Sequence, residues 1–446
     1  MKRISIIGGG PGGLMTAYLL QKTANSPMNL TLFEASNRLG GKIHTSRFQA
    51  LPAQYEAGAA EFYDYSPVDD DPLKALIAEL GLSISPIGSS SVILDQKILC
   101  NLDDMRAHLG AEACAALLSF DRAAKDMVSP LEYYAGDPAA SPQTSRFDAL
   151  LEKIRPAATR RYIETLIHSD LATEPERTSV EYGMHNYLMN DPSYMQLYRI
   201  GGGNERLPEE LARRISATVR LNHVVTEIGR GADGKLVVAH DHRGVLGEDS
   251  FDFVIIALPH NYLTHLQFRG ERLAEAMRAH CAHYDHPAHY LRMTLLFERP
   301  FWRAKLDDAF FMLDRFGGCC LYDEGTRAPE MTYGVLGWLL GGQPALEMSA
   351  LDDATLIAAA LESLPDFLAE GRQWFREGRV HRWPYAVNAI PGGITPRARN
   401  LQHQPEPVGH PDLFVVGDYL FDSTLNGVLD SAEYVAEWLA SRIIDN

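Results

Sequence analysis

Cysteine is scarce in this sequence, and its few cysteines form no pattern that would hold a disulfide framework. The chain has 446 residues and five cysteines, with no CxxC pair: Cys100, Cys114, Cys281, Cys319 and Cys320. An odd, sparse set is typical of a reducing compartment rather than of a small secreted domain. We therefore expect a cytoplasmic protein with free thiols.

Positive charge and long apolar runs are also in short supply. The formal net charge is −17 at pH 7, and nucleic-acid binders need a basic face. Apolar runs such as the one around Ile93 are too short to span a bilayer. A glycine cluster begins at Gly8, which leaves no room for the apolar core of a signal peptide after Lys2 and Arg3. We expect neither nucleic acid nor a membrane as a partner.

No recognisable metal-binding set appears either. Histidine recurs at every third position in one stretch: His280, His283, His286 and His289. Asp285 and Pro287 interrupt any helix that would align these side chains, and no cysteine or acidic pair completes a ligand set. We expect no metal ion.

The N-terminus carries a glycine pattern that is specific for dinucleotides. A short β-rich run over residues 4–7 ends in a glycine cluster, and an apolar stretch of helical character follows from Leu14. In the spacing Gly8-x-Gly10-x-x-Gly13, the first glycine serves the tight turn, the second the approach of a pyrophosphate and the third helix–strand packing. The helix N-terminus then faces the phosphates. The predicted phosphate loop consists of Gly8, Gly10, Pro11, Gly12 and Gly13.

A second strand is expected over residues 30–33, and it ends in Glu34 and Ala35. A carboxylate about 20 residues after the glycines is where ribose hydroxyls need an acceptor. The alternative interpretation is a glycine-rich turn followed by a chance acid. The strand–loop–helix context favours a bound dinucleotide.

The run from Glu34 to Thr45 resembles the second FAD motif of the flavin amine oxidase superfamily. That group includes monoamine, polyamine and L-amino-acid oxidases, protoporphyrinogen oxidase and phytoene desaturases. The resemblance implies FAD, with Arg38 and Gly41 of the glycine pair around its pyrophosphate. Lys42 stands where an arginine is usual, which keeps the charge but loses the planar fork.

Further blocks follow in the order seen in this superfamily. Residues 198–208 resemble its glycine-pair block, and in residues 221–228 the position of Val225 implies a backbone contact with adenine. Residues 253–259 read as a fully apolar, buried parallel strand.

The C-terminal block resembles the flavin-binding end of the superfamily. A strand over residues 413–416 delivers Gly417 and Asp418, which the resemblance places on the ribityl chain. A helix then begins near Gly427, Val428 and Leu429, with its N-terminus aimed at the flavin ring. A helix N-terminus stabilises the negative charge of reduced flavin, and the Leu429 N–H is the expected donor.

The fold class that follows is α/β: a discontinuous Rossmann-like FAD-binding domain with an α+β substrate domain of mixed sheet and helices. Helices are expected over residues 72–80, 111–125, 147–165 and 353–370, and strands over 291–297 and 332–339. Residues 400–410 read as an exposed linker. The predicted FAD-binding segments are residues 1–70, 200–268 and 400–446, and the predicted substrate-domain segments are residues 71–199 and 269–399.

The expected catalytic face begins with Gly58 and Ala59, which follow the glycine–alanine motif lining the re face of the flavin. L-Amino-acid oxidases usually have an arginine shortly after that pair, and here Glu61 takes its neighbourhood. A carboxylate there suits a cationic amine and could accept its proton. The alternative for Glu61 is a solvated or capping residue.

Many amine oxidases place a lysine near flavin N5. Counting back from the Pro300-Phe301-Trp302 landmark, the matching position holds Arg292. An always-charged guanidinium could stabilise an anionic flavin or a substrate carboxylate, but it could not accept a proton. The alternative is an ordinary strand residue in a different register.

The two-aromatic cage of monoamine oxidases is incomplete here. Its member beside the C-terminal flavin helix corresponds to Val428, and the other to Tyr385 or Trp383, although such a cluster also occurs in cores. Pro384 stands where monoamine oxidases carry the cysteine that links to FAD. We therefore expect non-covalent FAD.

These residues together predict an FAD-dependent amine oxidase. A hydride would pass from the carbon beside the amine nitrogen to flavin N5, giving an imine, with O2 as acceptor and H2O2 as product. The alternatives are an L-amino-acid oxidase, a desaturase or protoporphyrinogen-type dehydrogenase acting on C–C bonds, and a non-redox FAD protein. The sequence leaves the substrate, the acceptor and a homodimer open.

Overall fold

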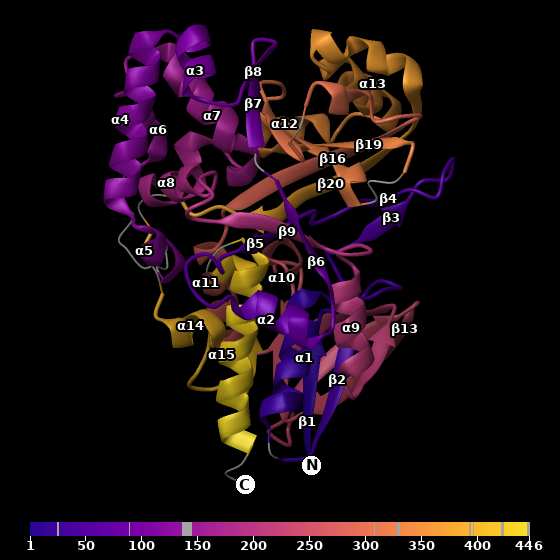
Figure 1. Cartoon of the computed structure of the whole chain (residues 1–446). Coiled ribbons are helices and arrows are strands. Elements are labelled where there is room, and N and C mark those ends of the chain that lie inside the picture. Colours follow the sequence, from indigo (N-terminus) through magenta and orange to yellow (C-terminus); the bar gives the residue numbers. More distant parts are fainter. Residues whose placement is uncertain are drawn as a thin grey trace.

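The computed structural model describes residues 1–24, 26–88, 90–135, 145–306, 308–327, 331–391, 394–395, 397–420 and 423–443. Both ends of the described chain lie at the narrow lower end of the molecule, and the broad upper end holds the largest sheet and most of the helices (Figure 1). No helix in these described ranges has both the length and the apolar character needed to cross a membrane.

The lower half is built on a five-stranded parallel sheet. Its order is β10 (Ala217–Leu221), β2 (Met28–Glu34), β1 (Lys2–Ile7), β14 (Phe253–Ile256) and β21 (Leu413–Val415). Because parallel strands need crossover connections, segments far apart in the chain lie side by side. Strands from three distant parts of the sequence therefore form one platform.

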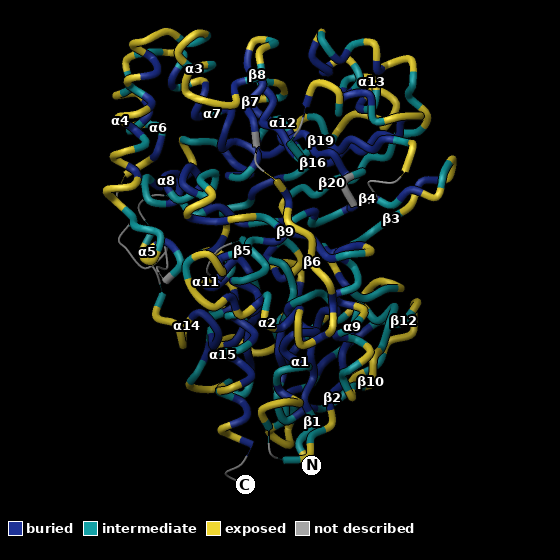
Figure 2. The backbone as a smooth tube through the Cα atoms, viewed as in Figure 1, coloured by how far each residue is buried: buried dark blue, intermediate teal, exposed yellow. Residues whose placement is uncertain are grey.

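Both faces of this sheet are covered. Ile4, Ile6 and Phe414 point to one face, which packs against α1 (Pro11–Thr23) and α15 (Leu425–Ile443). Ile7 and Val415 point to the other, because successive side chains of a strand alternate. The unbroken apolar runs follow from burial on both sides, and the strands form a dark-blue centre in Figure 2.

The second face packs against a four-stranded sheet and a helix. The sheet has the order β13 (Val245–Phe251), β12 (Leu236–His242), β11 (His223–Arg230) and β15 (Gln267–Phe268), and the helix is α11 (Glu271–His283). Ile228, Leu236 and Leu273 join the same core as Ile7 and Val254.

The upper half is built on a seven-stranded mixed sheet. Its order is β20 (Phe375–Asn388), β16 (Pro287–Phe297), β19 (Gly334–Gly341), β18 (Cys319–Asp323), β17 (Phe310–Leu313), β7 (Ser90–Leu94) and β8 (Lys97–Leu99). Only the β17–β7 pair is parallel among these neighbours.

Two groups of helices cover this mixed sheet. One face packs against α12 (Gly342–Met348) and α13 (Asp353–Ser363). The other packs against helices of the first inserted segment: α4 (Ala111–Met127), α6 (Phe147–Leu151), α7 (Ala157–Leu171) and α8 (Val180–Leu188).

A small sheet lies between the two halves, with the order β5 (Phe62–Asp64), β9 (Gln196–Ile200) and β6 (Ile84–Ile87) (Figure 1). A hairpin of β3 (Thr45–Arg47) and β4 (Gln54–Glu56) stands beside it. The remaining helices are α2 (Pro72–Glu79), α3 (Leu102–Leu109), α5 (Pro130–Ala135), α9 (Arg206–Arg214), α10 (His260–Leu263) and α14 (Arg399–His403).

The α/β class, with a doubly covered parallel sheet and a mixed-sheet second half, is confirmed. Three local predictions were wrong. The helix expected over residues 353–370 ends at Ser363, and a 3-10 segment follows Pro365 over Asp366–Trp374. The helix expected over residues 147–165 is divided into α6 and α7, because Pro156 lacks the N–H needed inside a helix and begins a new one as its N-cap. Residues 400–410 are packed rather than exposed, since Gln402, His403 and Glu406 are buried.

We propose the domain boundaries given above, because the parallel-sheet strands come from the three segments assigned to the FAD-binding domain.

Candidate functional site

The turn between β1 and α1 requires two of its glycines for packing inside the protein. Gly8 has φ +108°, and a Cβ there would lie 2.4 Å from the Ala257 carbonyl oxygen. A Cβ on Gly13 would lie 2.0 Å from the Gly8 carbonyl oxygen. These two positions accept only glycine, because a methyl group would collide with backbone.

Gly10 differs, because no protein atom requires it to be glycine. A Cβ there would meet nothing nearer than the Gly41 Cα at 3.8 Å, and its φ is an ordinary −76°. The space above Gly10 adjoins the N-terminus of the 13-residue helix α1, where backbone N–H groups favour an anion. This open cradle fits the pyrophosphate of a dinucleotide such as FAD.

Glu34 lies at the end of β2 and holds the glycine loop in shape. Its Oε2 accepts from the Gly9 N–H at 2.8 Å, and its Oε1 accepts from the Ser36 N–H at 2.8 Å. A carboxylate oxygen has two lone pairs, so both oxygens keep capacity for ribose hydroxyls. Ala35 follows on the surface.

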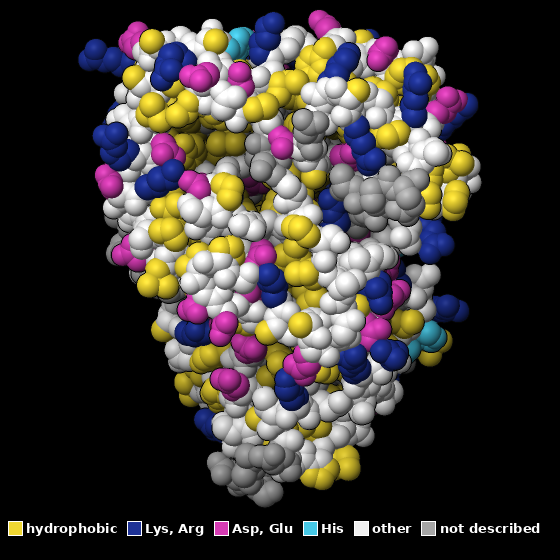
Figure 3. Space-filling model, viewed as in Figure 1, with side chains coloured by type: hydrophobic (Ala, Val, Ile, Leu, Met, Phe, Trp, Pro, Cys, Tyr) yellow, Lys and Arg dark blue, Asp and Glu magenta, His cyan; other side chains and the backbone are white. Residues whose placement is uncertain are grey.

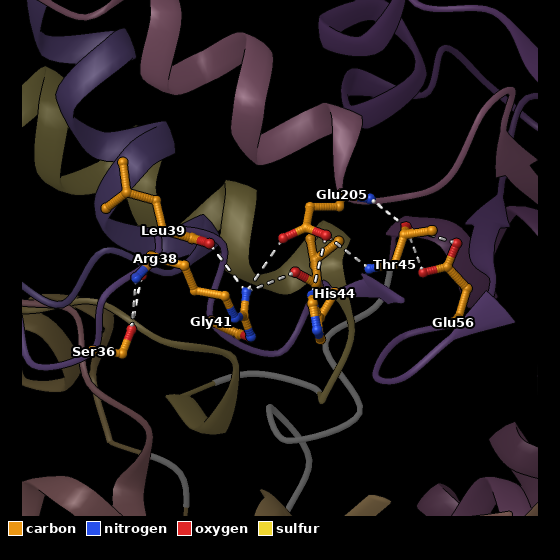
Figure 4. A network of polar contacts seen from close by, with 9 residues as sticks. Ser36, Arg38, Leu39, Gly41, His44, Thr45, Glu56 and Glu205 are labelled. Carbon is orange, nitrogen blue, oxygen red and sulfur yellow. Dashed lines mark hydrogen bonds and ion pairs between the residues drawn. The ribbon is translucent and has the colours of Figure 1, made fainter. Parts of the chain in front are cut away.

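Arg38 is tied to its own loop rather than extended into open space. Its Nη1 donates to the Leu39 carbonyl at 3.0 Å and its Nη2 to the Gly41 carbonyl at 2.6 Å (Figure 4). Its guanidinium also lies 3.6 Å from the Glu205 carboxylate. The pyrophosphate role expected of Arg38 stays a prediction. The contacts show that Arg38 fixes the carbonyl groups of the glycine pair.

Glu205 connects the N-terminal loop to the middle of the chain. Besides Arg38, its Oε2 lies 3.0 Å from His44 Nδ1 and accepts from the Thr45 N–H at 3.0 Å (Figure 4). Thr45 in turn donates to the buried Glu56 carboxylate. Sequence reasoning missed both acids as partners, although Glu205 stands in the glycine-pair block.

Lys42 joins three distant segments at the base of the site. Its Nζ lies 2.7 Å from Asp418 Oδ2 and donates to the Ala386 carbonyl at 2.8 Å. Asp418 follows β21 directly, after Gly417, whose N–H donates to Ser431 of α15. The cation that replaces the usual arginine is therefore paired with the acid expected at the ribityl chain.

The glycine–alanine motif packs on Lys42 as well. A Cβ on Gly58 would lie 1.9 Å from the Lys42 carbonyl oxygen, and the Ala59 N–H donates to the same oxygen at 3.0 Å. Gly58 therefore has to be glycine for the two segments to meet.

The N-terminus of α15 faces the same region. Thr424 caps this helix: the Gly427 N–H donates to its Oγ1 at 3.0 Å, and the Val428 N–H to its carbonyl at 3.2 Å. The N–H groups of Leu425 and Asn426 have no partner within the described chain. Leu429 is the fifth residue of the helix and lies past the four positions whose N–H groups lack an intrahelical acceptor. The Leu429 contact stays a prediction, and the geometry favours Leu425 or Asn426 as donor.

These elements enclose a cavity of about 170 Å³ between the two halves. It brings together nine of the predicted site residues: Pro11, Lys42, Gly58, Ala59, Glu61, Arg292, Trp383, Asp418 and Val428. Val225 lies elsewhere, half-buried beside a bulge in β11, against the core under the parallel sheet. This position leaves its adenine contact a prediction.

The two aromatic candidates occupy different places. Trp383 lines the cavity, and its Nε1 donates to the Ala57 carbonyl at 2.8 Å. Tyr385 is not among the lining residues and is 48% exposed, with φ at +58°. Its N–H donates to His289 Nδ1 at 3.0 Å, and its ring meets the His289 ring edge-on. Of these two candidates, Trp383 is therefore the one that can contact a ligand in this cavity.

Arg292 lies on β16 with its side chain 1% exposed, and it forms an ion pair with the equally buried Glu324. Burial lowers the pKa of this guanidinium, whereas the negative charges of Glu324 and Glu61 raise it. The raising effects are larger together, so the pKa of Arg292 lies above its ordinary value. Its Nε and Nη1 have no hydrogen-bond partner in the described part of the chain. Two buried donors on the cavity wall are thus available to a ligand acceptor. No pattern in the sequence indicates Glu324 as a partner of Arg292, since it lies 32 residues further along the chain.

Glu61 lines the same cavity and lies near Arg292. Its Oε1 accepts a hydrogen bond from the Tyr322 hydroxyl at 2.8 Å. Asp170, at the end of α7, lies near the negative charge of Glu61. Burial, and to a smaller extent this charge, raises the pKa of the Asp170 carboxyl to about 8. No pattern in the sequence indicates Asp170, which the fold brings near Glu61 from the first inserted segment.

No group of three or more metal-ligating side chains occurs among the residues that the structure describes. The four regularly spaced histidines have separate surroundings. His280 is buried with its Nε2 3.2 Å from the Tyr419 hydroxyl, whereas His289 accepts from Tyr385.

Known proteins share both the sequence pattern and the fold. The family model described as flavin containing amine oxidoreductase matches residues 11–439. The flavin-dependent L-tryptophan oxidase of Lentzea aerocolonigenes is 25% identical over 305 residues, which are 60% of this chain and 60% of that protein. The putrescine oxidase of Kocuria rosea is 23% identical over 341 residues, 68% of this chain and 66% of that protein. The cyclohexylamine oxidase of Brevibacterium oxydans shares the fold, with a TM-score of 0.74 and 18% identity over 99% of both chains.

Proposed function

The chain belongs to the flavin-containing amine oxidoreductase family, and from this we propose that it oxidises the C–N bond of an amine. FAD is the cofactor of this oxidoreductase. When bound, FAD would supply a two-electron acceptor for the hydride from the carbon beside the amine nitrogen, and O2 would take up these electrons to give H2O2. The imine product would hydrolyse in water.

The residues that would hold FAD divide by the part of the molecule they face. The open cradle at Gly10 and the α1 N-terminus would take the pyrophosphate, and Glu34 the adenosine ribose. Asp418, held by Lys42, would meet the ribityl chain. The free N–H groups at the start of α15 and the guanidinium of Arg292 would face the ring. No cysteine is among the residues found to line the cavity, which supports non-covalent binding.

The observation that carries the amine proposal is the carboxylate of Glu61 on a wall that is otherwise mostly apolar. Pocket walls with few polar groups use those groups to orient the ligand. A carboxylate attracts an ammonium group and can take its proton, which leaves the neutral amine that gives up a hydride. Trp383 and Tyr290 supply aromatic surface beside it.

A second candidate, oxidation of an L-amino acid, is supported by Arg292. Its Nε and Nη1 are buried, line the cavity and have no partner in the described ranges, so they could receive a carboxylate. Against this reading, Glu324 already neutralises Arg292, and Glu61 would repel a carboxylate. The amine therefore stays the first choice.

A peroxide-release screen of the FAD-loaded protein with primary amines, secondary amines and L-amino acids decides between the candidates. We expect turnover with amines and none with amino acids. Turnover restricted to amino acids would select the second candidate. Failure of every compound to bleach the flavin without air would reject both.

A further inference from the structure

A single tyrosine contacts both Glu61 and Arg292. Tyr322 lies on β18, and its hydroxyl donates a hydrogen bond to Glu61 Oε1 at 2.8 Å. The guanidinium carbon of Arg292 lies 5.3 Å from the centre of the Tyr322 ring, which is the geometry of a cation–π contact. Tyr322 therefore meets the carboxylate with its hydroxyl and the cation with its ring.

Arg292 has its counter-ion elsewhere. Its Nη2 donates to Glu324 Oε1, and both side chains are buried. Gly337 on β19 leaves room for this pair, since a Cβ there would lie 3.2 Å from Arg292 Nη2 and 3.3 Å from Glu324 Oε1. The charge of Arg292 is thus balanced without Glu61.

The contact between Tyr322 and Glu61 lies in apolar surroundings. Both residues also line a second cavity of about 410 Å³, together with Leu197, Phe310 and Met312. Figure 3 shows that the face beside β7 is hollowed and that hydrophobic side chains gather there. A hydrogen bond acts more strongly in such surroundings than in water. Burial raises the pKa of the Tyr322 phenol well above its ordinary value, so the hydroxyl keeps its proton and stays a donor.

A hydrogen bond donated to an ionised carboxylate stabilises the ionised form and lowers its affinity for a proton. A carboxylate that takes a proton from an ammonium group has to be ionised before the substrate arrives. A direct ion pair with a guanidinium would also keep it ionised, but the guanidinium would occupy the oxygens that the ammonium needs.

We propose that Tyr322 is a positioning residue: its hydroxyl keeps Glu61 ionised, and its ring keeps Arg292 from pairing with Glu61. Glu324 completes the arrangement as the counter-ion of Arg292. This inference rests on the proposed oxidation of an amine and adds how the proton acceptor is prepared before the substrate binds.

Other groups near Glu61 also act on its ionisation. Those close to it are Tyr63, Tyr290, Cys320, Asp170 and Arg292, and the paired Lys42 and Asp418 share its cavity. Burial raises the pKa of the two tyrosines and of the cysteine well above their ordinary values. Asp170 differs, since its pKa is raised to about 8 by burial and by the charge of Glu61. Its titration is common to the native protein and the variants, so a comparison between them isolates the hydroxyl.

Tyr322→Phe removes the hydroxyl and keeps the ring. The acid limb of the kcat/KM profile with the best amine reports the proton acceptor of the free enzyme. This limb should move upward by about 1 pH unit, the equivalent of one charge-assisted hydrogen bond, and the loss in kcat/KM should shrink as the pH rises. Tyr194→Phe is the matched control and should keep the native limb, because Tyr194 is another buried tyrosine, whose hydroxyl donates to the Val128 carbonyl.

Binding of an amine that cannot react gives a readout without turnover. α,α-Dimethylbenzylamine has no hydrogen on the carbon beside its nitrogen, so it binds as a cation and is not oxidised. Its dissociation constant, measured calorimetrically with the FAD-loaded protein from pH 5 to pH 9, should show the same upward shift in Tyr322→Phe.

Glu324→Gln tests the counter-ion. The unopposed charge of Arg292 should then act on Glu61 and move the acid limb downward, opposite to the shift in Tyr322→Phe. Asp323→Asn is the control, because Asp323 is an equally buried neighbour that pairs with Arg303 and is not among the residues found to line the cavity. Tyr322→Phe decides the proposal alone where Glu324→Gln does not fold.

An acid limb that stays in place in Tyr322→Phe, in kinetics and in binding, would overturn the proposal. A loss of equal size at every pH would also overturn it, because it indicates a purely structural role. Absence of turnover with every amine would instead reject the proposed function, whereas the binding titration still shows whether Tyr322 acts on Glu61.

Discussion

At the scale of single residues, Lys42, Glu61, Arg292 and Trp383 all line the first cavity. The resemblance to the amine oxidase superfamily singled out each of these positions. Their partners Asp418, Tyr322 and Glu324 come from elements that only the completed fold brings near. A pairing of this kind leaves no local trace in the sequence, because it depends on how strands are ordered and not on neighbours along the chain. Tyr385 shows a second limit: residues two apart on a regular strand share a face, but Tyr385 has φ +58° and does not line the cavity with Trp383.

Glu61→Gln tests the proton-accepting role at this scale. The change keeps the shape and the hydrogen bond from Tyr322, but it removes the charge and the basic oxygen. Turnover with the best amine should fall by roughly 10²–10⁴-fold, the range for a lost general base. Stopped-flow measurement of flavin reduction gives the number. Glu112→Gln, at an exposed position of α4, is the control, and native-like reduction in Glu61→Gln would remove Glu61 from the mechanism.

At the scale of elements, the turn between β1 and α1 shows that glycines of one motif are needed for different reasons. Gly8 and Gly13 are required by backbone contacts, whereas Gly10 has free space above it. The sequence pattern predicted all of these roles, because the fingerprint encodes a strand, a turn and a helix in one short stretch. The break at Pro156 was missed although proline is its signal in the sequence, because an apolar helical pattern continues on both sides.

Alanine substitutions distinguish a glycine that the fold requires from a glycine that cofactor binding requires. Gly10→Ala should fold with native thermal stability, because its Cβ meets nothing nearer than 3.8 Å, but it should weaken FAD binding by about 1–3 kcal/mol, the usual cost of an extra methyl in a filled site. Gly13→Ala should lower the melting temperature of the apoprotein itself, since its Cβ would lie 2.0 Å from a carbonyl oxygen. Circular dichroism melts and flavin fluorescence titrations measure the two effects. The reverse result, an unstable Gly10→Ala, would mean that the space at Gly10 belongs to protein packing.

At the scale of the whole molecule, FAD would join segments that are far apart in the chain. Pro11, Lys42, Arg292 and Asp418 surround one space. The class and its two halves could be predicted from the order of the blocks, whereas the strand order of the seven-stranded sheet could not, because β7 and β17 are separated by more than 200 residues. The pairing of strands so far apart in the chain depends on tertiary packing, which the periodicity of apolar residues in the sequence does not indicate.

A ligand that joins these segments should stabilise the entire fold. Adding FAD to apoprotein at about 100 times its dissociation constant should add about 2.7 kcal/mol to the free energy of unfolding, seen as a higher melting temperature. Riboflavin is the control, because it lacks the phosphates and adenosine held by the β1–α1 turn. The supernatant after acid precipitation should contain the flavin. Colour retained in the pellet would contradict non-covalent binding.

The last parallel strand, β21, and the helix after it have a consequence for the protein while it is being made. Asp418 and the start of α15 follow β1, β2 and β14 in the chain, yet they line the predicted flavin site and cover one face of the first strand. A nascent chain that has already made β1, β2 and β14 still lacks one edge of its sheet and one side of the cofactor site. We therefore expect a chain truncated before β21 not to retain the cofactor.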